Sequence, residues 1–322
     1  MRKYLTILCL SCFLCILLSS SGCFFIRGTE RYTVFSDPDR NVSLVGGTES
    51  VSLGIVIDDK EFLVFDKGGN ERFRKIFQKR IIQLDMLYYL SLLVFEDGSI
   101  EIYSCDDKQN ELISEYSFET GIVKAELMRK SSAIVLLDNG ELWKSAGDDY
   151  SEFNLIESGV VDCSYSISSG TILCINEGGD LKCSSNRYKL SPELQSLSGV
   201  KEIKDAYYYS DPDKKIRYMA ICESESYFIS VDSDADKVYL SDVTPVLDPE
   251  TLDVSKTISE GVSYRENGKY YYEGPSKNER DYYGGRYKNR FQLSVPEGYS
   301  IHTILGGVIF YNDHEVKVLL IN

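Results

Sequence analysis

Histidine, tryptophan and proline are scarce in this chain. Its 322 residues include two histidines, one tryptophan and seven prolines. His302 and His314 give little material for a His-based catalytic triad or for a zinc site that mixes cysteine and histidine. The sequence also has no Gly-x-Ser-x-Gly elbow and no glycine-rich loop of the kind that holds phosphate. We therefore assign no catalytic residue and no cofactor, and we expect a protein that is not an enzyme.

Positive charge is in deficit as well. The formal net charge is −15 at pH 7, and it becomes −17 without residues 1–22, which carry two basic residues and no acid. Proteins that bind the phosphate backbone need a positive surface, so we expect no nucleic-acid partner. What the chain has in quantity is tyrosine, with 24 residues, together with valine and isoleucine. These residue types favour strands over helices.

Only one long apolar run is present in the sequence, at residues 4–18. It falls short of the roughly 20 apolar residues that a membrane-spanning helix needs. Arg2 and Lys3 precede it, and three serines and a glycine follow it. This order of a positive start, a short apolar core and small residues is typical of a secretory signal peptide.

Cys23 and the small residues before it resemble the lipobox of bacterial lipoproteins, although Ser20 stands where leucine is usual. The resemblance implies cleavage after Gly22 and a lipid on Cys23, and more than one acyl chain makes such an anchor stable. We expect a signal peptide at 1–22, a lipidated tether at 23–30, and a protein anchored to a membrane of the bacterial cell envelope, facing the periplasm or the exterior. An ordinary cleaved signal and an uncleaved anchor are the alternatives.

Four of the nine cysteines lie at or before residue 23, and five follow: Cys105, Cys163, Cys174, Cys183 and Cys222. An odd number cannot all be paired within one chain. Cys174 and Cys183 lie symmetrically about Gly178 and Gly179. A hairpin with this turn predicts that the two cysteines face each other and form a disulfide, and two buried thiols are the alternative. The pairing of Cys105, Cys163 and Cys222 is left open.

A pattern of apolar strand, tight polar turn and second apolar strand recurs along the chain. Successive turns lie 39 to 46 residues apart. Asn-Gly and Asp-Gly between apolar runs are strong hairpin signals, because a type I′ turn needs positive φ at both central residues. The seven turns are Asp58-Asp59, Asp97-Gly98, Asn139-Gly140, Gly178-Gly179, Ser224-Glu225, Asn267-Gly268 and Asp313-His314.

Further strand signals precede several of these hairpins, at residues 121–125, 159–163 and 199–203. Three to four strands per roughly 40 residues is the unit of a β-propeller blade. We therefore predict an all-β fold, a seven-bladed β-propeller at residues 31–322. A six- or eight-bladed propeller, another antiparallel β-repeat and a meander of unrelated hairpins are the alternatives. Residues 31–36 are predicted to close the ring by pairing with the last strand, 315–321, because an open ring exposes strand edges.

Residues 121–147 combine a glycine-initiated strand with a hairpin that contains Asn139-Gly140 and Trp143, and residues 159–185 repeat this order. The order resembles the repeats of regulator-of-chromosome-condensation-type propellers over residues 80–230. Two hallmarks of that family are missing, the Gly-x-x-His ahead of the hairpin and the Gly-Gln-Leu-Gly turn between blades. The resemblance implies the propeller fold and no nuclear role, because a fold does not determine a function.

Residues 264–290 are the most unusual stretch, with seven tyrosines and a local charge of +3 in an acidic protein. Tyrosine and arginine are enriched in recognition surfaces. We expect ligand binding here, and strands that alternate between core and solvent are the alternative. The candidate ligand-binding residues are Tyr264, Tyr270, Tyr271, Tyr272, Tyr282, Tyr283, Arg286 and Tyr287.

Two charged segments have weaker interpretations. Asp232, Asp234 and Asp236 alternate like the first ligands of a calcium loop, but the glycine and the closing glutamate of that motif are missing. A solvated acidic loop is the alternative. The basic residues of 72–80 are interleaved with apolar ones, which predicts a short amphipathic helix or a solvated loop between blades.

The sequence leads to two hypotheses of function. The first is a lipid-anchored propeller that binds or scaffolds a protein or glycan partner in the cell envelope. The second is a glycosidase-like propeller hydrolase that uses paired carboxylates on the central channel. The two differ in a visible way, because the enzyme needs two converging carboxyl groups and the binding module needs an exposed contact surface.

Overall fold

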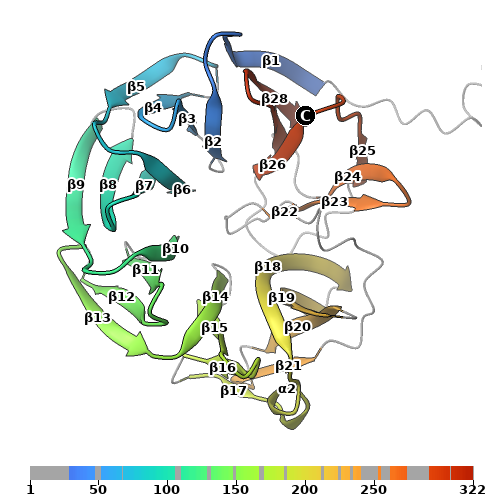
Figure 1. The fold of residues 1–322 in the computed structure, drawn as a ribbon. Helices are drawn as coiled ribbons and strands as arrows, with labels where there is room; N and C mark the ends of the chain where they lie inside the picture. The colour runs from blue at the N-terminus through green and yellow to red at the C-terminus, as the bar shows by residue number, and fades with distance from the viewer. Residues whose placement is uncertain are drawn as a thin grey trace, which may run out of the picture.

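The computed structural model describes residues 29–47, 52–66, 68–105, 110–128, 132–147, 150–166, 170–184, 187–211, 214–223, 226–232, 235–240, 253–254, 262–273, 290–304 and 306–321. Within these ranges the strands form seven sheets, which stand around one axis as the blades of a propeller (Figure 1). The predicted all-β, seven-bladed β-propeller is therefore confirmed. In the described part of the chain, no helix has the length and apolar character to cross a membrane.

Blades 1 to 3 have four strands each, which follow the chain from the axis outward (Figure 1). Blade 1 has β2 (Val42–Gly47), β3 (Leu53–Ile57), β4 (Glu61–Phe65) and β5 (Glu71–Ile76). Blade 2 has β6 (Ile81–Leu87), β7 (Leu90–Phe95), β8 (Ser99–Cys105) and β9 (Asn110–Ser117). Blade 3 has β10 (Ile122–Met128), β11 (Ser132–Leu137), β12 (Leu142–Ala146) and β13 (Glu152–Glu157).

Blades 4 and 5 divide their strands unequally. Blade 4 has only β14 (Val160–Ser166), β15 (Thr171–Asn176) and β16 (Leu181–Cys183) among the described residues. The next strand, β17 (Lys189–Leu190), leaves blade 4 and pairs in parallel with β21 (Lys237–Leu240) of blade 5. The short helix α2 (Pro192–Gln195) follows it, and β18 (Val200–Asp211), β19 (Lys214–Cys222) and β20 (Ser226–Asp232) complete blade 5.

Blades 6 and 7 complete the ring. Blade 6 has β22 (Asp253–Val254), β23 (Val262–Glu266), β24 (Lys269–Glu273) and β25 (Arg290–Leu293). Blade 7 has β26 (Ser300–Ile304), β27 (Gly307–Tyr311) and β28 (Glu315–Ile321), and its outermost strand is β1 (Thr29–Ser36) from the start of the propeller.

The second strands of the blades are apolar because neighbouring blades cover both of their faces. All described positions of β3 (LGIVI) and β7 (LSLLVF) are buried. The outer strand β9 instead has four exposed residues followed by an alternation of half-buried and exposed ones. Continuous apolar runs and alternating runs thus mark inner and outer positions in a blade. Residues 72–76 of the basic segment lie in the outer strand β5, so the predicted helix is wrong, and residues 77–80 form the loop that connects this strand to the next blade.

The hairpin turns explain why the predicted cysteine pair does not form. Asp58 and Asp59 both have positive φ, as a type I′ turn requires, but in the Gly178-Gly179 turn only Gly179 does. That turn has one more residue than we predicted, so the strand register shifts by one position. Cys174 lies opposite Lys182, and Cys183 lies opposite Leu173. The structure has both cysteines as thiols, and it does not place them face to face.

The ring closes as predicted, by pairing of the first and last strands. Tyr32 lies opposite Val318 and Phe35 opposite Val316 in the antiparallel pair of β1 and β28. In Figure 1 the blue β1 lies beside the red β28. Blade 7 therefore contains both the first and the last strand of the propeller. Because β1 pairs with β28, the backbone edge of β28 is not left open.

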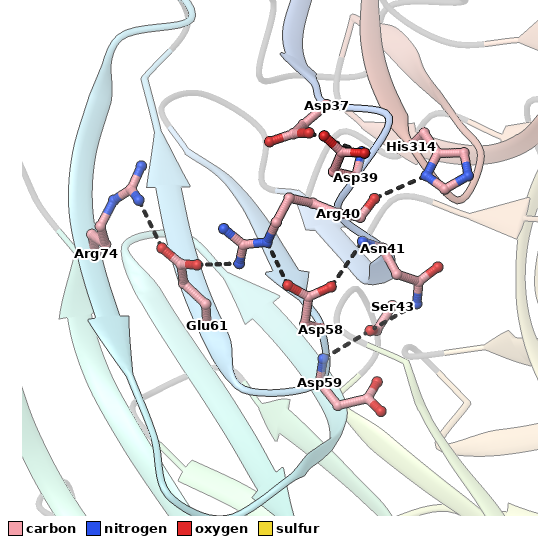
Figure 2. Close-up of polar contacts among 10 residues, drawn as sticks. All are labelled: Asp37, Asp39, Arg40, Asn41, Ser43, Asp58, Asp59, Glu61, Arg74 and His314. Carbon is pink, nitrogen blue, oxygen red and sulfur yellow. Dashed lines mark hydrogen bonds and ion pairs between the residues drawn. The ribbon is translucent and has the colours of Figure 1, made fainter.

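Polar contacts around Arg40 strengthen this closure (Figure 2). The Arg40 guanidinium forms ion pairs with Asp58 and Glu61 of blade 1, and its carbonyl oxygen accepts a hydrogen bond from His314 Nδ1 of blade 7 at 2.9 Å. Asn41 N donates to Asp58 Oδ1 at 2.9 Å. The segment that connects β1 to β2 is thereby fixed to both the first and the last blade.

Candidate functional site

The innermost strands share one irregularity at their start. In the first five blades, the second residue of the inner strand is an extra residue that has no partner on the next strand. Such a β-bulge turns a side chain out of the regular ladder and is common beside functional sites. The bulged residues are Ser43, Ile82, Val123, Val161 and Lys201.

Three adjacent bulges expose apolar side chains. Ile82 is 44% exposed, Val123 is 58% exposed and Val161 is 47% exposed. Equivalent positions of propeller blades lie on one face of the ring, around its axis. We call these three residues the apolar arc. Isolated exposed valines are ordinary, but three at matching positions of consecutive blades form a patterned surface.

Acidic side chains surround the apolar arc. The hairpin turns of the same blades lie at this end of the inner strands, because Glu96 N donates to Arg80 O and Asp138 N donates to Gly121 O. Glu96, Asp138 and Glu177 of these turns are exposed. Within the described residues none of the three carboxylates has an ion-pair partner. The surface around the arc therefore carries uncompensated negative charge.

Polar side chains of the inner strands tie each blade to the next. The Gln83 side chain donates to Ala125 O at 2.7 Å and accepts from Ala125 N at 3.1 Å. Asp85 Oδ2 accepts from Leu127 N at 2.6 Å, and Asp162 Oδ2 accepts from Ile203 N at 2.8 Å. These carboxylates thus serve the backbone of the neighbouring blade.

A lysine on β10 also connects its inner strand to the inner strand of the next blade. Lys124 Nζ donates to Cys163 O and lies 3.3 Å from Glu126 and 3.4 Å from Asp162. Burial acts to lower the pKa of Lys124, but the carboxylates of Glu126 and Asp162 outweigh it and raise the pKa overall. Asp85 and Asp162 are thus engaged in contacts between blades, whereas Glu126 pairs with Lys124 of its own strand. The hydrolase hypothesis stays a prediction.

Four of the predicted ligand-binding tyrosines lie in blade 6, where they pack on one another and on arginine. Tyr264 and Tyr272 are buried. Tyr264 and Tyr271 lie opposite each other with ring centroids 5.9 Å apart, and the Arg290 guanidinium is 3.8 Å from the Tyr271 ring centroid. Tyr272 OH accepts from Gly306 N of blade 7 at 3.0 Å. These contacts pack the tyrosines within blade 6 and against blade 7, and their assignment as ligand-binding residues stays a prediction.

The remaining tyrosine candidates and the lipidation site lie outside the described residues. They are Tyr282, Tyr283, Arg286, Tyr287 and Cys23. Their assignments stay predictions.

The predicted calcium ligands are engaged elsewhere where the structure describes them. Asp232 Oδ1 accepts from Ala235 N at 3.0 Å, and Asp236 forms an ion pair with Arg187 at 2.6 Å. Asp234 lies outside the described residues. Across the described ranges, no group of three or more His, Cys, Asp or Glu side chains is placed to hold a metal ion.

The apolar arc was missed in the sequence, although a signal for it was present. Residues 121–125 and 159–163 both read glycine, then an inner-strand residue, then valine. Only the structure shows that this valine is a bulge and is exposed. A pattern of apolar residues alone predicts burial, since a regular strand would place one of two successive β-branched residues in the core.

Comparison with known proteins supports the β-propeller fold but assigns the chain to no family. No family model matches the chain, and no curated protein matches it. Several solved structures do. The β-propeller domain of Myceliophteria thermophila Cps50 (Swd1) has a TM-score of 0.55 at 11% identity, and 89% of this chain and 99% of that one are covered.

Two further solved structures are similar. The WD40 domain of Toxoplasma gondii coronin has a TM-score of 0.54 at 12% identity, over 92% of this chain and 88% of that one. YCF48 bound to D1 peptide has a TM-score of 0.52 at 10% identity, over 91% and 95%. The architecture is that of a β-propeller. At these identities the likeness concerns the fold alone.

Proposed function

We propose that this chain is a lipid-anchored binding module of the bacterial cell envelope, and that it holds a protein partner on the face of the apolar arc. The observation that carries the proposal is the row of exposed residues Ile82, Val123 and Val161 on three consecutive inner strands. Similar propellers bind proteins at least in one case, since YCF48 is described as bound to D1 peptide. The anchor on Cys23 and the repeat resemblance rest on the sequence.

The chemistry of the surface defines the partner. The arc is aliphatic, so it offers hydrophobic area and no hydrogen-bonding groups, which suits apolar protein side chains better than a hydroxyl-rich glycan. The carboxylates of Glu96, Asp138 and Glu177 around it attract lysine and arginine. We therefore expect a segment in which apolar side chains are flanked by basic residues.

Binding of designed peptides tests this function. Three fluorescent peptides are compared: one alternates leucine and lysine, one replaces lysine with glutamate, and one replaces leucine with serine. We expect the first to bind at least tenfold tighter than the others and to weaken with salt, because exposed charges are screened. Equal affinity for all three peptides would contradict the proposal.

Variants locate the binding surface in the same assay. The double variant Val123→Ser, Val161→Ser removes apolar area from the arc, and we expect its Kd to rise about tenfold, since roughly 1–2 kcal/mol of burial is lost. Leu155→Ser is the matched control, because Leu155 is 46% exposed on the outer strand β13. If the control weakens binding as much as the double variant, the arc is not the site.

The anchor has its own test. If Cys23 carries the lipid, the Cys23→Ser variant cannot receive it and accumulates as a water-soluble or unprocessed form. Wild type should partition with detergent in a phase-separation experiment. If the serine variant partitions like wild type, the attachment lies elsewhere.

A further inference from the structure

Blade 4 contains two cysteines that lie opposite each other on neighbouring strands, and the sequence analysis did not pair them. Cys163 on β14 and Cys174 on β15 are direct partners in the antiparallel register. The Cα atoms of such partners are about 4.5 or 5.5 Å apart, depending on which of the two kinds of pair they form. Both values fall in the range of about 4.4–6.8 Å that disulfides span.

Both side chains point to the same side of the blade. Cys163 and Cys174 belong to one core cluster, which spans blades 2 to 4 and includes Leu142 and Phe153 of blade 3. Each is 1% exposed. Cys183 packs instead against the cluster between blades 4 and 5. The sheet of blade 4 therefore separates Cys183 from the other two cysteines.

We propose that Cys163 and Cys174 form a cross-strand disulfide when the chain folds in the presence of a small-molecule disulfide oxidant. The structure has both side chains as thiols, so the proposed bond is a modification of this state. An exported protein meets such oxidising conditions, which is the setting that the signal peptide predicts.

The reaction is thiol–disulfide exchange in two steps. The thiolate of one cysteine attacks the oxidant R–S–S–R, a protein–S–S–R bond forms, and R–SH leaves after protonation. The thiolate of the second cysteine then attacks the protein sulfur of this mixed disulfide, the Cys163–Cys174 bond forms, and a second R–SH leaves. The two cysteines are oxidised by two electrons in total, and the oxidant is reduced by two.

The bond must form before the blades pack. Burial raises the pKa of Cys174 to about 12 and raises that of Cys163 well above its ordinary value, so the folded thiols are poor nucleophiles. The hairpin itself is local, because Ser166 pairs with Thr171 and Gly170 N donates to Ser166 O across its turn. A hairpin forms in about 1–10 μs, so the two thiols meet while still accessible.

A disulfide at this place would also stabilise blade 4. Among the described residues, blade 4 is the only sheet with three strands, whereas the other six have four or five. A covalent link between β14 and β15 restricts the unfolded chain and adds to the ladder where it is narrowest.

Refolding followed by mass spectrometry tests the proposal. The full chain is purified in detergent, reduced and unfolded in guanidinium chloride, and refolded with oxidised and reduced glutathione. Remaining thiols are then alkylated under denaturing conditions before digestion with trypsin. Residues 145–182 form one tryptic peptide that holds Cys163 and Cys174 and no other cysteine, and Cys183 falls in the next peptide, 183–187.

The proposal predicts that peptide 145–182 carries no alkyl group and is lighter by two hydrogens than its reduced form, while peptide 183–187 is alkylated. Cys183→Ser should leave this result unchanged, and Cys163→Ser should leave Cys174 alkylated. The proposal is overturned if both cysteines of peptide 145–182 are alkylated after refolding. It is equally overturned if that peptide is cross-linked to 183–187, because Cys174 would then have paired with Cys183.

Discussion

Single polar side chains hold the blades of this propeller to one another. Gln83, Asp85 and Asp162 each reach from an inner strand to the backbone of the next inner strand. A buried amide without an acceptor costs more than the net gain of an ordinary hydrogen bond. These side chains therefore contribute to stability mainly because their loss would leave a buried backbone group unsatisfied.

Replacement of Asp85 tests this role. Asp85→Ala leaves the N–H of Leu127 without that acceptor in a buried place, and we expect a loss of about 1–3 kcal/mol in the free energy of unfolding. Asp85→Asn keeps a side-chain oxygen and should lose less. Lys201→Ala removes only the exposed ion pair with Glu223 and should leave the stability nearly unchanged. Urea unfolding measures all three, and equal losses for alanine and asparagine would argue against the hydrogen bond.

Acid should weaken the closure of the ring. The hydrogen bond from Asn41 N, together with the Arg40 ion pair, holds the pKa of Asp58 below its ordinary value despite some burial. A lowered folded-state pKa stabilises the protein above the unfolded pKa of about 4, and this contribution is lost as pH falls through the folded-state value. We expect the urea midpoint to fall between pH 5 and pH 3, with a shallower fall in Asp58→Asn. An identical pH profile for the variant would show that Asp58 does not contribute.

Residue-level function was the hardest to predict from sequence. Tyrosines at 264 and 272 gave a recognition signal by composition, yet both are buried. Whether a tyrosine in a strand packs or binds depends on which face the neighbouring blade covers, and a single sequence does not contain that information. The valines of the apolar arc show the opposite error, because a bulge exposes residues whose type favours the core.

Hairpins are the elements that the sequence predicts best. Turn residues with positive φ, such as Asn267 and Gly268, lie where the Asn-Gly signal placed them. The register is less predictable, because one additional turn residue shifts every following pair by one position. This shift in the β15–β16 hairpin separated Cys174 from Cys183, whereas the other hairpin, β14–β15, sets Cys174 opposite Cys163. The strand β5 was missed because its outer position makes it polar and basic.

Alanine substitutions at two glycines distinguish the cost of backbone strain from the cost of crowding at the turns. Gly159 and Gly179 have similar positive φ, 69° and 77°, but only a Cβ on Gly179 would meet other atoms, with Gly199 N at 2.8 Å. Gly159→Ala should lose about 1–2 kcal/mol from conformation alone. Gly179→Ala should lose about 1 kcal/mol more, because the turn must move away from blade 5. Thermal unfolding compares them, and a smaller loss in Gly179→Ala would contradict this packing.

For the whole molecule, the sequence repeat predicts both the number of blades and the closure of the ring. A period near 40 residues and an unpaired early strand were enough to predict seven blades closed by β1 and β28. The exchange of β17 from blade 4 to blade 5 was not predictable, because β17 is two residues long and its place depends on tertiary pairing with β21.

Loss of the first strand should therefore destabilise the entire ring. Deletion of residues 24–40 removes β1 and the Arg40 ion pairs, and leaves β28 with an unpaired edge. We expect one cooperative transition at a clearly lower melting temperature. Deletion of residues 24–28, which precede β1, is the control and should leave the melting temperature unchanged. If both truncations melt like the parent, β1 does not hold the ring closed.

Photo-crosslinking in intact cells tests whether the apolar arc binds a protein partner in the cell envelope. A photoreactive amino acid is placed at position 82, 123 or 161, and at positions 76 and 155 as controls, where Ile76 and Leu155 are exposed on outer strands. We expect the same discrete adduct from all three arc positions after irradiation, and none from the controls. Adducts only at the outer positions, or at no position, would contradict it.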